Sequence, residues 1–222
     1  MAADIVPGAP AWIIRRYPSS DIKDKMQLVR ISNPFGAATF ATFELTVPLF
    51  SLYANPMQPG GSFIVMPGSH CGAALQDVDG AKHLVAAFLT GNAAKEPRVQ
   101  WMRFDVSAAP KLVDSGLIDP GPGLSTFNAS VAINGQGDMG LIYCQVGLSE
   151  QLSVWVAGRS LADPPGTMRR ELCKQSEKPL LAYGRFGDYS GISVDVKDDW
   201  FWATNQYSEG SWATWVQQFK LK

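Results

Sequence analysis

A guanidinium, a carboxylate and a phenol lie within five consecutive residues, at Arg185, Asp188 and Tyr189. Together these groups can hold a polyhydroxylated or anionic ligand through charge-assisted hydrogen bonds. The same residues also suit a purely structural role, in which Asp188 accepts backbone N–H groups in a turn, Arg185 pairs with it, and Tyr189 packs between neighbouring sheets. The sequence leaves both interpretations open. The first one makes this segment the candidate ligand-binding site.

A pattern that occurs three times supplies the elements around these residues. Each copy reads as a short apolar strand, a polar turn, a strongly apolar strand, a looser loop and a third strand. The copies cover residues 72–106, 128–158 and 189–221. Each third strand carries one tryptophan, at Trp101, Trp155 and Trp215. Repetition at this period is typical of β-propeller blades, whose first strands line a central channel. The candidate ligand residues would then face the channel mouth, where ligands commonly bind.

The remaining segments complete the predicted fold. Residues 111–118 and 168–174 precede or follow loops rich in proline and glycine, and we interpret them as fourth strands. Residues 28–32 and 39–47 read as two more strands, which form the outer part of an incomplete blade. The prediction is an all-β protein, a β-propeller of three to four antiparallel blades. It is either a small ring or a partial propeller.

Turn chemistry supports the predicted hairpins. Asn134 to Asp138 and Asp79-Gly80 contain residues that tolerate a left-handed backbone, and each lies between two apolar strands. Glycines at 135, 137 and 140 superficially suggest a phosphate loop, but a strand follows them rather than a helix. We therefore predict a hairpin turn there.

The chain resembles a known group of proteins, most specifically after Phe127. The motifs that carry the resemblance are RFGDYSGISVD at 185–195, DDWFW at 198–202 and WATWVQQF at 212–219. They resemble the closing blade of large, mostly uncharacterised bacterial secreted β-propeller proteins, and FNASVAIN at 127–134 is similar to their penultimate blade. The resemblance covers roughly residues 25–222. It implies a scaffold, often attached to a larger surface or secreted protein, without assigned catalytic residues.

The same resemblance implies an extracellular location and further blades ahead of this segment. However, the first 25 residues lack the charged start and apolar centre of a signal peptide. The sequence therefore assigns no compartment. It also leaves open whether the chain pairs as a homodimer or receives missing blades from a longer parent chain.

A propeller glycosidase of the sialidase type is the enzymatic alternative. Its chemistry needs several arginines around a carboxylate, a tyrosine nucleophile and a separate acid/base carboxylate. Tyr189 and Asp188 are adjacent, and Arg103, Arg159 and Arg185 are spread over the predicted blades. The hallmark turn S-x-D-x-G-x-T-W is matched only in part, by SEGSWATW near the C-terminus. We assign no catalytic residue and treat hydrolysis as the weaker hypothesis.

Two further residues complete the candidate site. Asn128 occupies the position that matches the ligand segment one blade earlier, and Trp212 lies at a junction of loop and strand. Exposed tryptophans stack on sugar rings, whereas Trp200 and Trp202 are expected to pack in the core. The favoured function is a non-enzymatic scaffold or binding module for a glycan or protein surface. Its candidate residues are Asn128, Arg185, Asp188, Tyr189 and Trp212. A fragment of a larger propeller without independent activity is the third hypothesis.

Composition excludes several other classes of protein. The net charge is −1 without a long basic run, so nucleic acid is not an expected partner. No window approaches the roughly 18 apolar residues of a membrane span. The 222 residues are enough for one large core, and we expect an N-terminal extension over residues 1–24 and one domain over 25–222.

Cysteine and histidine usage predicts no metal site and no cofactor. Three cysteines at positions 71, 144 and 173 form no CxxC pair, and the two histidines stand apart from acidic or cysteine clusters. Cys144 lies between apolar neighbours in a predicted strand, so we expect it to be a small buried core residue.

Overall fold

The computed structural model describes residues 2–3, 8–17, 23–66, 72–180, 186–187 and 189–221. Within these ranges the chain forms strands, turns and loops without a helix, which confirms the all-β prediction. The strands form four antiparallel sheets, each built from strands that are consecutive in the chain. These sheets are blades of a propeller type, and the prediction of three to four antiparallel blades is confirmed.

The sheets follow chain order. The first contains β1 (Ala2–Ala3), β2 (Ala11–Arg16), β3 (Lys25–Ser32) and β4 (Thr39–Thr46). The second contains β5 (Gly72–Val78), β6 (Ala81–Gly91), β7 (Pro97–Asp105) and β8 (Lys111–Ile118). The third contains β9 (Leu124–Ile133), β10 (Met139–Gly147), β11 (Glu150–Arg159) and β12 (Arg169–Gln175). The fourth has three strands, β13 (Gly191–Val194), β14 (Phe201–Ser208) and β15 (Trp212–Phe219).

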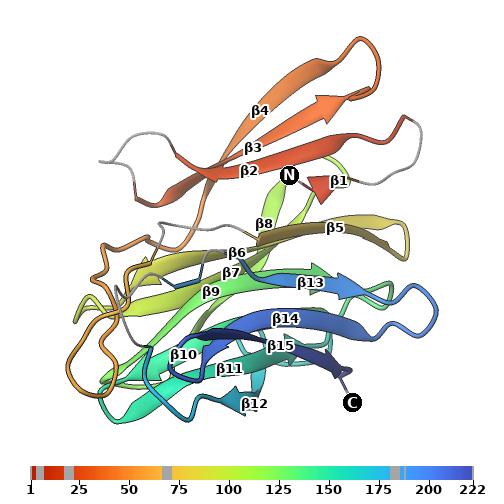
Figure 1. The fold of residues 1–222 in the computed structure, drawn as a ribbon. Helices are drawn as coiled ribbons and strands as arrows, with labels where there is room; N and C mark the ends of the chain where they lie inside the picture. The colour runs from red at the N-terminus through yellow and green to blue at the C-terminus, as the bar shows by residue number, and fades with distance from the viewer. Residues whose placement is uncertain are drawn as a thin grey trace.

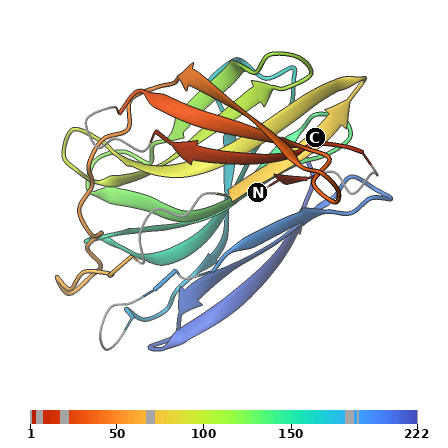
Figure 2. The ribbon, with the colours of Figure 1, turned by 90° about the horizontal axis from the view of Figure 1, so that it is seen from above.

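The four sheets pack face to face in chain order and form an arc. In Figure 1 the first sheet is at the top, the second lies below it, and the third and fourth lie together in the lower half, with β12 of the third sheet lowest. Figure 2 places the first and fourth sheets on opposite sides. Neighbouring sheets meet through their first strands, since β5 lies against both β1 and β9, and β13 lies against β9. The second and third sheets are therefore enclosed on both faces, while the first and fourth each turn one face outward.

The first sheet begins earlier than the sequence analysis placed it. β2 lies inside the predicted extension over residues 1–24, and it pairs with β3 along its whole length, from Ala11 opposite Ile31 to Arg16 opposite Met26. The unit expected to be incomplete thus has four strands. The two predicted fourth strands appear as β8 and β12. A six-residue strand with an arginine pair at its end carries too little periodicity to stand out in sequence.

Two-sided burial explains the long apolar run of β6. Leu84, Ala86 and Phe88 belong to the core between the first and second sheets, where they meet Trp12 and Leu28. The alternate residues Val85 and Ala87 belong to the core between the second and third sheets. Successive side chains of a strand point to opposite faces, so a strand buried on both faces reads as continuously apolar.

The interface between the third and fourth sheets depends on a glycine. Ile142, Val154 and Val156 pack there against Ala203 and Tyr207. A Cβ atom at Gly140 would lie 2.8 Å from the ring of Phe201, a separation that real contacts essentially never show. The absent side chain at residue 140 therefore leaves the space that the Phe201 ring fills.

Each repeated tryptophan is covered by a cation. The Arg159 guanidinium lies 5.4 Å from the ring centroid of Trp101, and Arg170 lies 5.9 Å from that of Trp155. The ammonium of Lys174 lies 5.7 Å from the ring of Trp215. These cation–π contacts attract β11 to β7 and β12 to β15 between sheets, and β12 to β11 within the third sheet. The repeat that predicted the fold is thus a packing motif.

The turn predictions are confirmed. Asp79 and Gly80 both have positive φ, of 52° and 82°, as a two-residue hairpin turn with mirror-image geometry requires. In the turn between β9 and β10, Gly137 has a φ of 83°. The Asn134 side-chain oxygen accepts the N–H groups of Gln136 and Asp138 at 3.1 and 2.9 Å.

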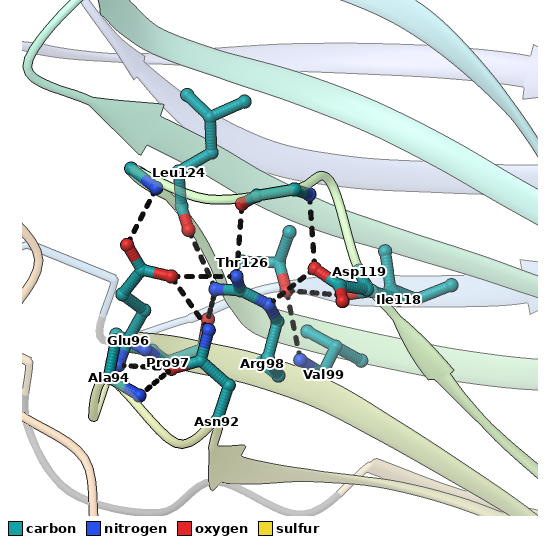
Figure 3. Close-up of polar contacts among 12 residues, drawn as sticks. Asn92, Ala94, Glu96, Pro97, Arg98, Val99, Ile118, Asp119, Leu124 and Thr126 are labelled. Atoms are coloured by element: carbon teal, nitrogen blue, oxygen red, sulfur yellow. Dashed lines mark hydrogen bonds and ion pairs between the residues drawn. The ribbon is translucent and has the colours of Figure 1, made fainter.

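A buried arginine fastens the crossover from the second sheet to the third (Figure 3). Arg98 is 1% exposed, and its guanidinium donates to Asp119, Glu96 and three backbone carbonyls. The carbonyls are those of Pro97, Leu124 and Gly121, at 3.0, 2.6 and 3.0 Å. Because Asp119 and Leu124 flank the loop between β8 and β9, one side chain fixes both ends of that loop.

At the far end of β7, Asp105 is held as a carboxylate. It accepts the backbone N–H of Ser107 at 2.9 Å and pairs with Lys111 at 3.2 Å. Hydrogen bonds from Ser107 and the charge of Lys111 outweigh partial burial and lower the pKa of Asp105 from 3.8 to about 2.

We predict that Arg98→Met lowers the free energy of unfolding by about 3 kcal/mol, because buried carbonyls and two carboxylates lose their partner. The free energy of unfolding of Arg98→Lys should fall between those of this variant and the parent. A single ammonium group cannot make all five hydrogen bonds of the guanidinium. Urea unfolding measures both. The control is Arg169→Met, which removes a surface pair with Asp163 at 3.0 Å and should cost less than about 1 kcal/mol. Equal losses for Arg98→Met and Arg169→Met would contradict the assignment.

We also predict a specific acid dependence. The folded pKa of Asp105 is below its ordinary value of 3.8, so its contribution to stability is complete above pH 3.8 and is lost as pH falls towards 2. Asp105→Asn should therefore lose less stability than the parent across that window. Lys111→Met should keep part of this loss of stability at low pH, because the hydrogen bonds from Ser107 to Asp105 remain. Unfolding measured in urea between pH 5 and 2 checks this, and parallel curves for parent and Asp105→Asn would refute it.

Candidate functional site

Three of the five candidate residues lie in the described part of the chain, namely Asn128, Tyr189 and Trp212. Arg185 and Asp188 lie outside the described residues. Tyr189 stands just before β13, and Trp212 is the first residue of β15. Trp212 therefore belongs to the fourth sheet, at the end of the arc, and Tyr189 lies on the segment that leads into that sheet (Figure 1).

Tyr189 and Trp212 line the same hollow. It has a volume of about 350 Å³ and is open to solvent. Tyr189 is 82% exposed and Trp212 is 67% exposed, so neither ring is packed between sheets. The lining residues are Tyr189, Ser190, Gly191, Thr204, Asn205, Gln206, Trp212 and Thr214. The structure thus brings together two of the residues that the sequence had placed 23 positions apart.

Strand alternation creates this surface. Along β14, Phe201, Ala203 and Asn205 are buried, whereas Trp202 and Thr204 are exposed. Along β15, Trp212, Thr214 and Val216 are exposed in the same alternating manner. Thr204 lies opposite Val216, and Gln206 lies opposite Thr214. We call this surface the outer face, defined by Ser193, Trp202, Thr204, Trp212, Thr214 and Val216.

The outer face continues past the first hollow. A second, shallower depression of about 520 Å³ is lined by Trp202, Thr204 and Val216, together with Ser193 and neighbouring residues of β13. Trp202 is 43% exposed, so the prediction that it packs in the core is wrong. Alternation in the sequence identified the residues that share its strand face. It carried no information on whether another sheet covers that face.

Asn128 lies in the interface between the third and fourth sheets, behind the hollow. It is 8% exposed and adopts a positive φ of 52° in β9. Its amide donates to Asn205 Oδ1 at 2.8 Å, and Asn205 returns a bond to the Asn128 carbonyl at 2.9 Å. The same amide reaches the Tyr189 carbonyl at 3.5 Å. Asn128 therefore joins the third sheet to the segment that carries Tyr189.

Two neighbours complete this buried network. The thiol of Cys144 donates to Asn205 Oδ1 at 3.3 Å, and the backbone N–H of Gly187 donates to Gln206 Oε1 at 3.1 Å. Burial raises the pKa of the Cys144 thiol far above its ordinary value, which keeps it neutral. The prediction that Cys144 is a buried core residue is confirmed.

The arginines considered for a sialidase-type site lie elsewhere. Arg103 and Arg159 are 3% and 4% exposed. Arg103 donates to the Gly137 carbonyl at 2.9 Å, and Arg159 pairs with Asp114. These contacts lie between the second and third sheets, and neither arginine lines the hollow beside Tyr189.

In the part of the chain that the structure describes, no three His, Cys, Asp or Glu side chains are grouped closely enough to hold a metal ion. His83 instead accepts a hydrogen bond from Arg103 at 3.3 Å, and burial together with this positive neighbour lowers its pKa. Among the same residues, none forms a helix of the length and apolarity that crossing a membrane requires.

Comparison with known proteins gives one structural likeness. No family model matches the chain, and no curated protein matches it. The crystal structure of an endo-arabinase from Bacteroides thetaiotaomicron VPI-5482 aligns with 96% of this chain and 75% of that chain. The TM-score is 0.38 and the sequence identity is 11%. At these values, no activity carries over from that enzyme to this chain.

We predict that Asn205→Ala lowers the free energy of unfolding by about 1–3 kcal/mol, because the Asn128 amide and the Cys144 thiol lose their buried acceptor. The matched control is Thr204→Val on the same strand, which changes an exposed side chain and should cost within about 0.5 kcal/mol. Thermal and urea unfolding measure both. Equal stabilities would show that this network does not join the two sheets.

Proposed function

We propose that this protein is a non-enzymatic glycan-binding module and that the outer face of the fourth sheet is its binding surface. The observation that carries the proposal is the pairing of two strongly exposed aromatic rings, Tyr189 and Trp212, around one hollow of about 350 Å³. Isolated exposed aromatics are common on surfaces, whereas two that flank a concave site favour a ligand with a flat apolar face.

The chemistry of the hollow suits a sugar. The apolar face of a pyranose or furanose ring stacks on an aromatic ring, and its hydroxyl groups require hydrogen-bond partners at the edge. Hydroxyl and amide side chains of Ser190, Thr204, Gln206 and Thr214 line the same hollow. Among the described residues, these partners are neutral, and they therefore favour an uncharged glycan. Arg185 and Asp188 are proposed as further ligand residues on the grounds of sequence.

The surface suits an elongated ligand. Trp212 lies opposite Ser208, and Trp202 precedes Ser208 by six positions on β14. A strand rises about 3.3 Å per residue, so the two tryptophans are separated by about 20 Å along the strand. A chain of several sugar units can contact Trp202, the Thr204 hydroxyl and Trp212 together. In this proposal, Asn128 is a positioning residue that holds the Tyr189 segment in place.

The two ends of the arc differ in a manner that favours this surface. On the first sheet, Arg15 donates to Gln27 at 2.7 Å, and Gln27 donates to Glu44 at 3.5 Å, which forms a polar ladder across the outward face. The fourth sheet instead presents Trp202, Trp212 and Val216. Phe40 on the first sheet is also exposed, at 69%, but Tyr189 and Trp212 line one hollow together, so we assign the ligand to the fourth sheet.

A protein surface is the second candidate for the same face. Val216 is 61% exposed beside Trp202, and a further blade would cover such apolar residues in a longer propeller. That blade would come from a second copy of the chain or from a longer parent protein of the kind that the sequence resembles. Light scattering on the purified chain separates these cases, since its monomer mass is 24.1 kDa.

We predict that Tyr189→Ala and Trp212→Ala each weaken binding at least tenfold, or about 1.4 kcal/mol, to the oligosaccharides that the parent retains on an array of neutral and acidic glycans. Trp202→Ala should weaken binding to long oligosaccharides more than to short ones. Titration calorimetry measures the affinities.

Phe35→Ala is the matched control, because Phe35 is an aromatic residue that is 81% exposed in the turn between β3 and β4, at the other end of the arc. It should bind as the parent does. If no glycan on the array binds the parent, or if Phe35→Ala and Trp212→Ala lose affinity equally, the proposal is wrong. Turnover of fluorogenic glycosides by the parent would contradict the non-enzymatic assignment.

A further inference from the structure

Within the described part of the chain, the fourth sheet has no outer strand of the kind that the other three sheets possess. The edges of those sheets are formed by β4, β8 and β12, each an antiparallel strand of seven or eight residues. Among the described residues, β15 pairs with β14 alone. An edge strand points every second N–H and C=O away from its sheet, so β15 offers a row of free backbone donors and acceptors.

The composition of β15 is that of an inner strand. Natural edge strands are commonly protected by charged residues or proline. β12 carries four charged residues, Arg169, Arg170, Glu171 and Lys174. By contrast, β15 reads WATWVQQF and contains neither a charged residue nor a proline. β15 therefore has the composition of a strand that is paired on both edges, although it lies at the edge of the fourth sheet.

A second, independent feature marks where that neighbour would lie. Beside the C-terminal end of β15, a hollow of about 250 Å³ is floored by Val156, Ala157 and Gly158 of β11. Its walls come from β12 and from the end of β15, at Arg169, Arg170, Glu171, Phe219, Lys220 and Leu221. Three cations and one carboxylate surround this apolar floor.

The cations of the hollow are held by weak or surface contacts. Arg169 pairs with Asp163 at 3.0 Å, and Arg170 lies 5.9 Å from the ring of Trp155. Lys220 donates to the Asp198 carbonyl at 2.9 Å. Asp163 offsets Arg169, and Glu171 offsets one further cation, so these residues keep an excess of one positive charge at the end of β15. That excess favours an acidic group on an arriving chain.

We propose that the edge of β15 is a docking site for an acidic, extended segment of a partner protein, which pairs antiparallel to β15 as the fourth strand of this sheet. The partner strand has seven or eight residues, by analogy with β4, β8 and β12. Its N-terminal half lies opposite Phe219 and carries Asp or Glu towards Arg170 and Lys220. Its alternate apolar residues cover the 250 Å³ hollow and the half-buried rings of Trp215 and Phe219.

Synthetic peptides test the proposal with the full chain. The probe is an acetylated octapeptide in which Asp and Glu alternate with Val in the first half and Thr alternates with Val in the second. A peptide with Lys in place of the acidic residues tests charge, and a version with alternate N-methylated amides tests backbone pairing. Binding is measured by calorimetry, and the paired strand is identified by hydrogen exchange of the β15 amides.

The proposal expects the acidic peptide to bind, to slow exchange of the β15 amides, and to bind at least tenfold more tightly than the lysine and N-methylated peptides. Lys220→Glu should reverse the preference for charge. Lys23→Glu is the control, since Lys23 is an exposed residue just before β3, away from β15, and its change should leave binding unchanged. The absence of binding, binding without protection of β15, or equal effects of the two variants would overturn the proposal. Protection of β15 that rises with protein concentration alone would overturn it in favour of a second copy of the chain.

Discussion

Each sheet of this protein must bury at least one face against a neighbour, and most of the structure follows from that constraint. The second and third sheets bury both faces, which requires the uninterrupted apolar residues of β6 and β10. It also requires small residues where large rings insert, as at Gly140 beneath Phe201. The first and fourth sheets bury one face only. Their outward faces differ: the first carries a polar ladder beside the exposed Phe40 ring, and the fourth carries a hollow lined by two aromatic rings.

Polar groups between the sheets provide the specificity that apolar packing lacks. Arg98 satisfies three carbonyls and two carboxylates at a single crossover, so the angle between the second and third sheets has little freedom. The Asn128–Asn205 pair performs the same task between the third and fourth sheets. Arg98, Asn128 and Asn205 are themselves buried, where an unpaired polar group is costly, and each network therefore favours one arrangement of its sheets over others.

The sequence predicted the strands well and the surfaces poorly, for a physical reason. Alternation and turn residues are local, and they located β8, the hairpins at Asp79 and Asn134, and the buried Cys144. Whether a strand face is covered depends on sheets that are distant in the chain, so the exposure of Trp202 was missed. Tyr189 and Trp212 were selected individually, but their meeting in one hollow depends on the register of β14 with β15. The short β2 was missed because six residues carry little periodic signal.

Packing between sheets that are neighbours in the chain has a consequence for how the molecule opens. When each unit is stabilised chiefly by the units beside it, the free energy of the array approximates a sum of unit terms and interface terms. A unit at either terminus loses one interface on detaching, whereas an interior unit must break two. Local opening should thus begin at the termini of the arc and spread inward, with the centre protected longest. The surface that we assign to ligands lies on one of these two terminal units, so a bound ligand would also stabilise that end of the array against local opening.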